Sequence, residues 1–126
     1  MEGLDRNLID GDLRPASGGA TFATVNPATE EVLGDAADGT PADLDAAIGA
    51  ARRAFDDGAW ASDPAFRAHC LRQLRDVLQA SAEELRELTI AEVGAPRFFT
   101  SIAQLDTPVA DLGYAADLAE SYEWTT

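Results

Sequence analysis

The sequence predicts strands in its first third and helices in the rest, which is an α+β chain or the edge of a larger α/β domain. Two observations carry this prediction. β-Branched, alternating segments bounded by turn signals fill the first forty residues, and from Thr40 the apolar residues recur with a helical period. A few short strands alone make a marginal sheet, so they are expected to depend on neighbouring structure. The length of 126 residues suits one domain, or a piece of one, over residues 1–126.

Composition excludes several classes of partner. Nine basic and 23 acidic residues give a formal net charge of −14. Such a chain is a poor ligand for nucleic acid or for an anionic membrane, because both require clustered Lys and Arg. No apolar run approaches the ~20 residues of a membrane helix, and no secretory signal is recognisable. The single cysteine cannot form an internal disulfide, so we expect a cytoplasmic protein.

The strand prediction rests on turn chemistry. Asp10-Gly11 lies between short apolar runs and predicts a hairpin over residues 8–13. Thr21–Val25 alternates and is β-branched, which predicts a strand. Asn26-Pro27-Ala28-Thr29 is typical of a turn, and residues 31–36 are then the returning strand.

The first helix is predicted from its capping signals. Thr40 is placed to cap, Pro41 stands at the first helical position, and Asp43 completes a capping box. Gly58 follows the last apolar position as a stop signal. One face of this helix carries the apolar residues Leu44, Ala47, Ile48, Ala51 and Phe55.

Further helices follow, to make four or five in total. One is expected to start near Ser62–Pro64, and a second capping box at residues 81–84 opens another that ends at Gly94. Pro96 begins a fourth helical stretch. Residues 106–108 interrupt or restart that stretch, which runs to about Tyr122.

The residues alone indicate no self-contained active site. His69 and Cys70 are adjacent, but neighbouring helical residues point about 100° apart and do not form a nucleophile–base pair. We expect Cys70 to be a small buried thiol and His69 to lie at the surface. A zinc site based on histidines is excluded by the single His, and Gly18-Gly19 lacks the pattern of a phosphate loop.

A family resemblance adds to this interpretation. Residues 8–12 followed by residues 22–34, FATVNPATEEVLG, resemble the opening of the NAD(P)-dependent aldehyde dehydrogenase family. Residues 43–55, DLDAAIGAARRAF, are similar to the helix that follows in that family. Trp60, Arg67, residues 71–78 and the stretch EVGAP at residues 92–96 continue the match. Ala95 departs from the Lys that is common there.

The resemblance implies the N-terminal part of the cofactor-binding domain, without its Rossmann core and catalytic residues. Neither catalytic nor cofactor-binding residues are therefore expected in this chain. NAD or NADP would serve the full-length family, and none is expected for this chain alone. The family's monovalent-cation site would map onto the carbonyls of Thr24 and Val25 and the carboxylate of Glu92, which are hard oxygen donors. By position, Ala103 and Thr107 would lie near the family's substrate entrance.

Three functions stay open at this point. The leading one is an N-terminal fragment or split subunit of an aldehyde dehydrogenase that converts an aldehyde to a carboxylic acid but is not active alone. Its partner would be the remainder of the fold, in the same gene product or a separate chain, and family members form homo-oligomers. The alternatives are a non-catalytic helical interaction module docking on a partner chain, and an unrelated acidic helical module.

Overall fold

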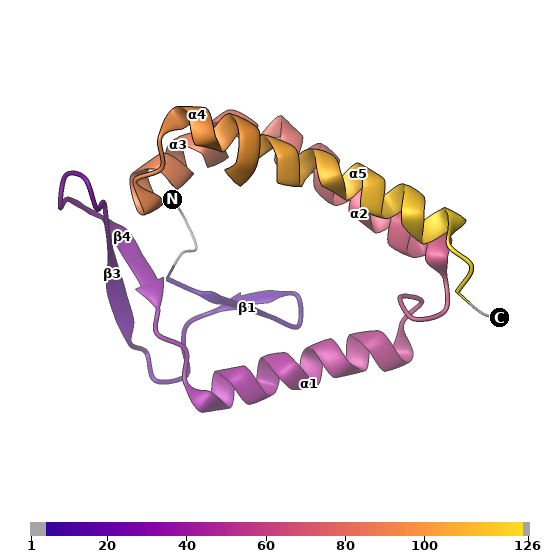
Figure 1. Cartoon of the computed structure of the whole chain (residues 1–126). Helices are drawn as coiled ribbons and strands as arrows, with labels where there is room; N and C mark the ends of the chain where they lie inside the picture. Colours follow the sequence, from indigo (N-terminus) through magenta and orange to yellow (C-terminus); the bar gives the residue numbers. More distant parts are fainter. Residues whose placement is uncertain (1–4, 125–126) are drawn as a thin grey trace. The chain divides into compact units, whose positions relative to one another are not determined.

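The computed structural model describes residues 5–124, which form two compact units. One unit reaches to Gly58 and contains the strands and helix α1; the other begins at Ala59 and contains the remaining helices. Figure 1 shows the elements of both units. Within residues 5–124, none of the helices combines the length and apolar character needed to span a bilayer.

The first hairpin is the one predicted. Strand β1 (Asn7–Ile9) pairs antiparallel with β2 (Asp12–Arg14), so that Ile9 lies opposite Asp12. The two turn residues, Asp10 and Gly11, both have positive φ, 58° and 83°. Positive φ at both central positions is the signature of a type I′ turn, which matches the right-handed twist of the strands. The prediction at Asp10-Gly11 is confirmed.

The second hairpin forms a separate two-stranded sheet. Strand β3 (Thr21–Val25) pairs antiparallel with β4 (Val32–Ala37), with a register shift between Thr24 and Val25. The side chain of Asn26 closes the turn, since its Oδ1 accepts from the backbone N–H of Ala28 at 2.8 Å. The returning strand begins and ends one residue later than predicted.

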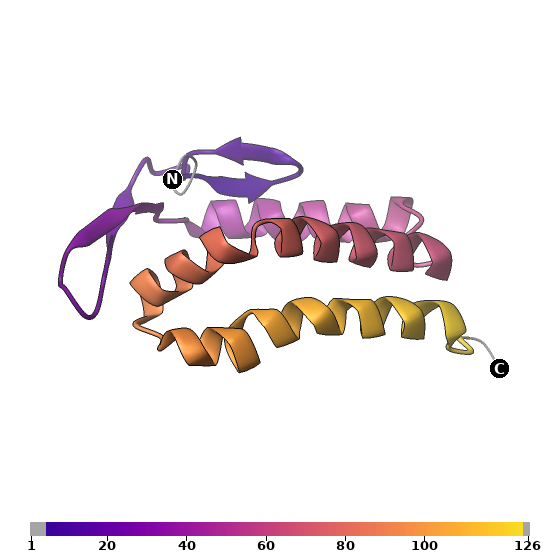
Figure 2. The same cartoon turned by 90° about the horizontal axis from the view of Figure 1, so that it is seen from above.

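Helix α1 (Pro41–Asp57) begins with the predicted capping box. The Thr40 hydroxyl accepts from the backbone N–H of Asp43, and the Asp43 carboxylate accepts from that of Thr40. Gly58 follows as the C-cap. The start of the helix packs against β1 of its own unit (Figure 2). The predicted apolar face exists but is exposed: Leu44, Ile48 and Phe55 keep 61%, 58% and 46% of their surface.

In the second unit, helices α2 (Pro64–Ala80) and α5 (Asp106–Ser121) lie side by side (Figures 1 and 2). Their contact is built on small residues: Ala68 and Ala116 are fully buried and Ala119 nearly so, with Leu71 packed against them. Alanine lets two helices approach closely but contributes little apolar area. The core of this unit is therefore thin.

Helix α3 (Ala82–Val93) does not have the predicted capping box at Ser81. The Ser81 side chain makes no capping hydrogen bond, and its backbone stays near the helical region at φ −101°, ψ 11°. Its own N–H donates to the carbonyls of Val77 and Gln79 at the end of α2. Because Ser81 still closes the preceding helix, it cannot take the extended conformation of an N-cap. The stop at Gly94 is confirmed, with φ 68°.

After Pro96 the helical path has three parts. A single turn, α4 (Arg97–Phe99), continues into the π-helix η1 (Thr100–Gln104), and Leu105 then leaves the helical region before α5 starts. The predicted interruption is therefore real and falls at Leu105. Pro108 lies in the first turn of α5, where a missing N–H is tolerated.

Candidate functional site

The three predicted cation ligands lie in regular elements. Thr24 and Val25 are in β3 of the first unit, and Glu92 is in the last turn of α3 in the second. Thr24 and Glu92 are half-buried, whereas Val25 is exposed. Throughout residues 5–124, no group of three or more His, Cys, Asp or Glu side chains is arranged to hold a metal. A site built from these two carbonyls and one carboxylate stays a prediction.

Asp43 is the most densely hydrogen-bonded carboxylate of the first unit. It accepts from the backbone N–H of Thr40 at 2.8 Å, from the Thr40 hydroxyl at 2.9 Å and from the backbone N–H of Ser17 at 3.0 Å. The backbone N–H of Thr40, and after it that of Ser17, lower the pKa of Asp43 to about 2. The capping role was predictable, but the bond to Ser17, 26 residues earlier, carried no sequence signal.

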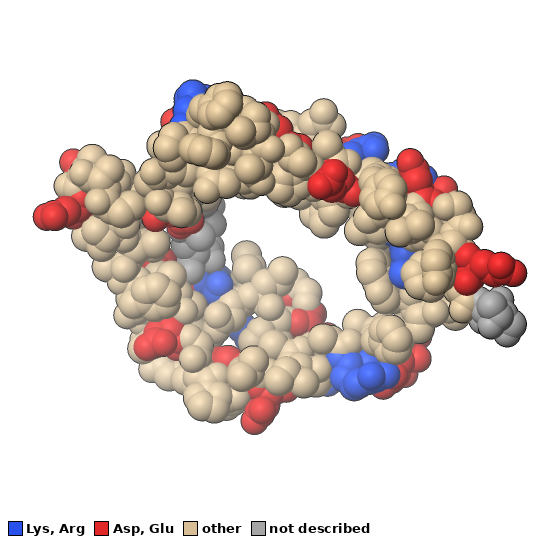
Figure 3. All heavy atoms as spheres, in the orientation of Figure 1, with Lys and Arg blue, Asp and Glu red and all other residues tan. Residues whose placement is uncertain are grey.

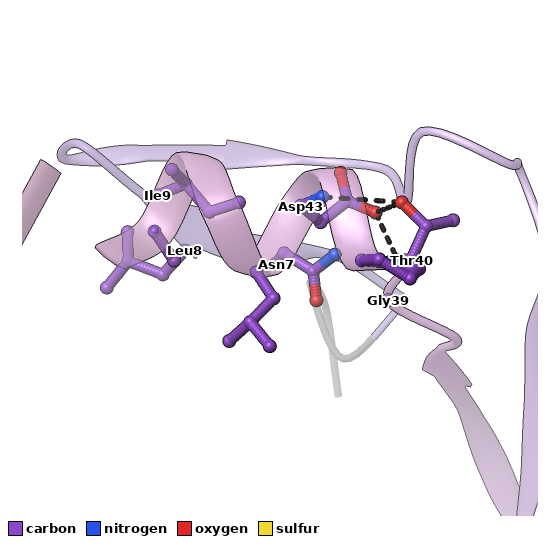
Figure 4. Close-up of a pocket in the computed structure, with 9 residues that line it drawn as sticks. Asn7, Leu8, Ile9, Gly39, Thr40 and Asp43 are labelled. Atoms are coloured by element: carbon purple, nitrogen blue, oxygen red, sulfur yellow. Dashed lines mark hydrogen bonds between the residues drawn. The ribbon is translucent and has the colours of Figure 1, made fainter. Parts of the chain in front are cut away.

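A pocket of about 560 Å³ lies beside this carboxylate. Figure 4 draws the residues that line it, which come from β1, from Gly39 and Thr40, and from the start of α1. Its lining residues are Asn7, Leu8, Ile9, Gly39, Thr40, Pro41, Asp43, Leu44 and Ala47. Nδ2 of Asn7 is buried and has no acceptor among the described residues. A general base needs a pKa near the working pH, so Asp43, with its low pKa, is suited to holding structure and not to proton transfer.

Arg86 organises the second unit in a comparable way. It is 8% exposed, and it donates to Asp106 at 2.7 Å, to Glu83 at 3.1 Å and to the hydroxyl of buried Thr100 at 2.9 Å. The two carboxylates raise the pKa of Arg86, with Asp106 as the main cause and Glu83 as the second. The sequence analysis missed this cluster because its members come from three elements.

The pocket beside Arg86 measures about 300 Å³ and is lined by Arg75, Gln79, Ala82, Arg86, Asp106, Val109 and Ala110. Its two arginines already have carboxylate partners: Arg86 binds Asp106, and Arg75 binds Asp76 at 2.7 Å. A buried cation that is paired and hydrogen-bonded is structurally satisfied. The two arginines of this pocket therefore have a structural role and are not free to bind a ligand.

Two further arginines of the second unit also bind groups of that unit. Arg72 on α2 binds Asp117 and Glu120 on α5, both at 2.8 Å. Arg67 donates to the carbonyl of Trp60 and lies over the Trp124 ring, 4.6 Å from its centre. The acidic excess is left at the surface, where carboxylates are distributed over the visible face in Figure 3.

The two residues weighed as a nucleophile–base pair take separate environments. His69 is exposed, as predicted, and Cys70 is a free thiol. Cys70 is only half-buried, which corrects the expectation of a buried thiol. The reason is geometric: α5 covers α2 along Ala68 and Leu71, and Cys70 is not part of that buried cluster.

The predicted substrate-entrance residues are both exposed. Ala103 lies in η1 and Thr107 in the first turn of α5, where the Thr107 hydroxyl donates to the carbonyl of Ile102 at 2.6 Å. Their relation to a substrate stays a prediction.

Comparison with known proteins identifies the chain. The model of the "Aldehyde dehydrogenase family" matches residues 14–126. The chain is 35% identical to DhaS of Bacillus subtilis (strain 168) over 92% of its length, and 37% identical to the aminoacetaldehyde dehydrogenase of Pseudomonas aeruginosa over 91%. It covers 24% and 23% of those two proteins, so it spans about a quarter of their length.

Solved structures agree with the sequence match. The NAD⁺ complex of the aldehyde dehydrogenase from Bacillus cereus superposes with a TM-score of 0.87 at 35% identity, covering 96% of this chain and 25% of that one. The paired strands followed by helices are thus the N-terminal piece of that fold. The chain belongs to the aldehyde dehydrogenase family and corresponds to its N-terminal segment.

Proposed function

We propose that this chain supplies the N-terminal quarter of an NAD(P)-dependent aldehyde dehydrogenase, which oxidises an aldehyde to a carboxylic acid, and that it has no such activity alone. The observation that carries the proposal is the family match, which extends over most of this chain yet over only a quarter of its relatives. The rest of the fold would then supply the chemistry.

The surface of the chain supports such a partner. The buried apolar residues are mostly alanines, while many large apolar side chains are exposed. Examples more than half exposed are Leu8, Phe22, Val32, Leu44, Ile48, Val77, Val93, Phe98, Tyr114, Tyr122 and Trp124. Covering one such side chain contributes roughly 1.5–3 kcal/mol, so burying this surface against the remaining three-quarters would stabilise the segment strongly.

The residues of this segment do not fit a nicotinamide cofactor by themselves. Among residues 5–124, the turn from β4 into α1 is the place where a strand leads into a helix N-terminus. There Thr40 and the ionised Asp43 already cap the helix. A carboxylate at that position occupies the amides that would bind a pyrophosphate and repels its charge. NAD or NADP would therefore be held by the rest of the enzyme.

The cation site belongs to the same proposal. The carbonyls of Thr24 and Val25 and the carboxylate of Glu92 are oxygen donors suited to a hard monovalent cation. An incomplete set of ligands binds weakly, so the site would form only when the remainder of the fold completes it.

A second candidate is a non-catalytic module that docks on another protein. The exposed apolar face of α1, formed by Leu44, Ile48 and Phe55, favours docking of some kind. This candidate differs from the first in predicting a complex that never produces NAD(P)H.

The direct test of inactivity uses the purified chain with NAD⁺ or NADP⁺ and a panel of aldehydes. We expect no NAD(P)H above the buffer level. Turnover that survives Cys70→Ala would contradict the assignment as a dependent segment. Turnover that this substitution abolishes would contradict it too, because it would make Cys70 catalytic.

A further inference from the structure

Among residues 5–124, no further strand pairs with either outer edge of the β3–β4 hairpin. The two strands form an isolated sheet, so each has one outer edge. The backbone N–H of Asp38 donates to the carbonyl of Ala20 at 2.9 Å, which makes these two a hydrogen-bonded pair. Such pairs alternate along an antiparallel ladder. Phe22↔Ala36 is therefore bonded, while the N–H groups of Thr21 and Ala23 point outward from β3.

The two edges of this hairpin differ in how readily they would pair with another strand. Strand β4 carries Gly34 and the charged Asp35, features that discourage further pairing. Strand β3 reads Thr-Phe-Ala-Thr-Val and contains no charge, glycine or proline. A β-branched, uncharged edge is a ready template for another strand.

Several large apolar side chains of the hairpin are also exposed. Phe22 lies on one face and keeps 55% of its surface, while Val25 and Leu33 keep 44% and 39%. An isolated two-stranded hairpin is marginally stable in water. This hairpin therefore has the surface of an internal sheet element and not of a solvent-exposed one.

We propose that β3 takes an extended strand from the remaining three-quarters of the aldehyde dehydrogenase fold, which adds to its outer edge by backbone hydrogen bonds. This inference rests on the proposed function. The second unit contains only helices among its described residues, so it offers no such strand. The family relatives, in contrast, have about three-quarters of their length outside this chain.

Charge argues against a second copy of this chain as the partner. The hairpin and its flanks carry Glu30, Glu31, Asp35 and Asp38, and no basic residue occurs between Arg14 and Arg52. Two such hairpins side by side would bring like charges together. The added strand, or the surface around it, is accordingly expected to carry basic residues.

The test uses a chimera in which residues 1–126 replace the matching quarter of the Bacillus cereus enzyme. Hydrogen exchange resolved to single amides is measured in the chimera for the outward N–H groups of Thr21 and Ala23 on β3 and of Asp35 on β4. We expect the two β3 amides to exchange at least about tenfold more slowly than that of Asp35, because only they gain acceptors. Equal exchange of the three amides in a folded chimera would overturn the proposal, whether or not the chimera is active.

A matched pair of proline substitutions adds a second readout. Ala23 and Asp35 are opposite each other in the register, and both point their N–H outward, so each proline leaves the β3–β4 ladder intact. Ala23→Pro is expected to abolish NAD(P)H production by the chimera, whereas Asp35→Pro, with Asp35→Ala as the charge control, is expected to keep it. Equal activity of both proline variants would contradict strand addition at β3.

Two further outcomes separate this proposal from the one on which it rests. A folded chimera that makes no NAD(P)H would contradict the proposed function, while its exchange pattern would still report on β3. A free chain that dimerises in sedimentation, and becomes monomeric with Ala23→Pro, would assign the edge to a second copy and overturn the choice of partner.

Discussion

Different interactions stabilise the inside of each of the two units. In the first, hydrogen bonds dominate: type I′ and Asn-closed turns, and a carboxylate, Asp43, that joins the 15–20 loop to α1. Its buried apolar residues are Ile9, Ala16 and Ala50 among those described. The second unit has a continuous helix–helix contact on Ala68 and Ala116, reinforced by arginine ion pairs between its helices.

The two units accordingly differ in how much stabilisation they need from further protein contacts. Hydrogen bonds specify a conformation but each contributes only about 0.5–1.5 kcal/mol net, whereas packing supplies most of the free energy of folding. The first unit is therefore well specified and weakly stabilised. The second has a small core of its own and should hold its helices better.

The strongest loss of structure is expected in the free chain. We expect it to retain helical far-UV signal, to lose near-UV signal and to bind a hydrophobic dye, as a molten state or a self-associated one. Hydrogen exchange should show β3 and β4 unprotected, with α2 and α5 retaining the most protection. One cooperative, monomeric unfolding transition with protection in both units would show that the chain has a sufficient core.

The next effect tests the alanine contact of the second unit. Ala116→Leu places three extra carbons where no space exists, and it should cost about 1–3 kcal/mol. Native-state hydrogen exchange of the chimera with the Bacillus cereus enzyme measures the opening free energies of α2 and α5. Ala110→Leu makes the same change at an exposed position of α5 and should stay within about 0.5 kcal/mol. Equal destabilisation by Ala116→Leu and Ala110→Leu would refute tight packing at Ala116.

A smaller effect compares the two helix starts. Thr40→Ala removes a capping hydroxyl that binds Asp43 and should destabilise the first turns of α1 by about 1 kcal/mol. Ser81→Ala is the matched control, because that hydroxyl caps nothing and its loss should leave α3 unchanged. Both are measured by exchange of the corresponding peptides. If Thr40→Ala left α1 unchanged, the capping box would not stabilise the first unit.

A further effect is confined to acid. The folded pKa of Asp43, about 2, lies below its ordinary value of 3.8, so the ionised form stabilises the folded unit above about pH 4. That contribution is lost as the pH falls towards 2. Exchange of α1 peptides over this range should show the loss, and Asp43→Asn should flatten the profile. The second unit should keep its own acid dependence, because the pKa values of Glu83 and Glu120 are lowered by Arg97 and Arg72.

Local features of the fold were predictable, because turns and caps depend on a few adjacent residues. Asp10-Gly11, Thr40 with Asp43, and Gly94 each specify their backbone geometry. Ser81 failed as a cap because one residue cannot both close α2 and open α3. Periodicity located the apolar face of α1 but not its exposure, since burial depends on what lies opposite.

In the candidate site, too, local sequence features were predictable and tertiary contacts were not. The family could be inferred from the order of motifs such as EVGAP at residues 92–96. The Arg86 cluster could not be predicted from the sequence, because Asp106 and Thr100 reach Arg86 only after η1 and the break at Leu105 have formed. The ligand set Thr24, Val25 and Glu92 came from the resemblance alone and stays a prediction.

Complementation in trans tests whether this chain is a working segment of an aldehyde dehydrogenase. The chain is mixed with the separately purified remaining three-quarters of the Bacillus cereus enzyme, and NAD(P)H formation from an aldehyde is followed. We predict no activity from either piece alone and activity from the mixture, saturating as this chain is added. Binding without any NAD(P)H formation would support the non-catalytic module, and activity of this chain on its own would contradict the account.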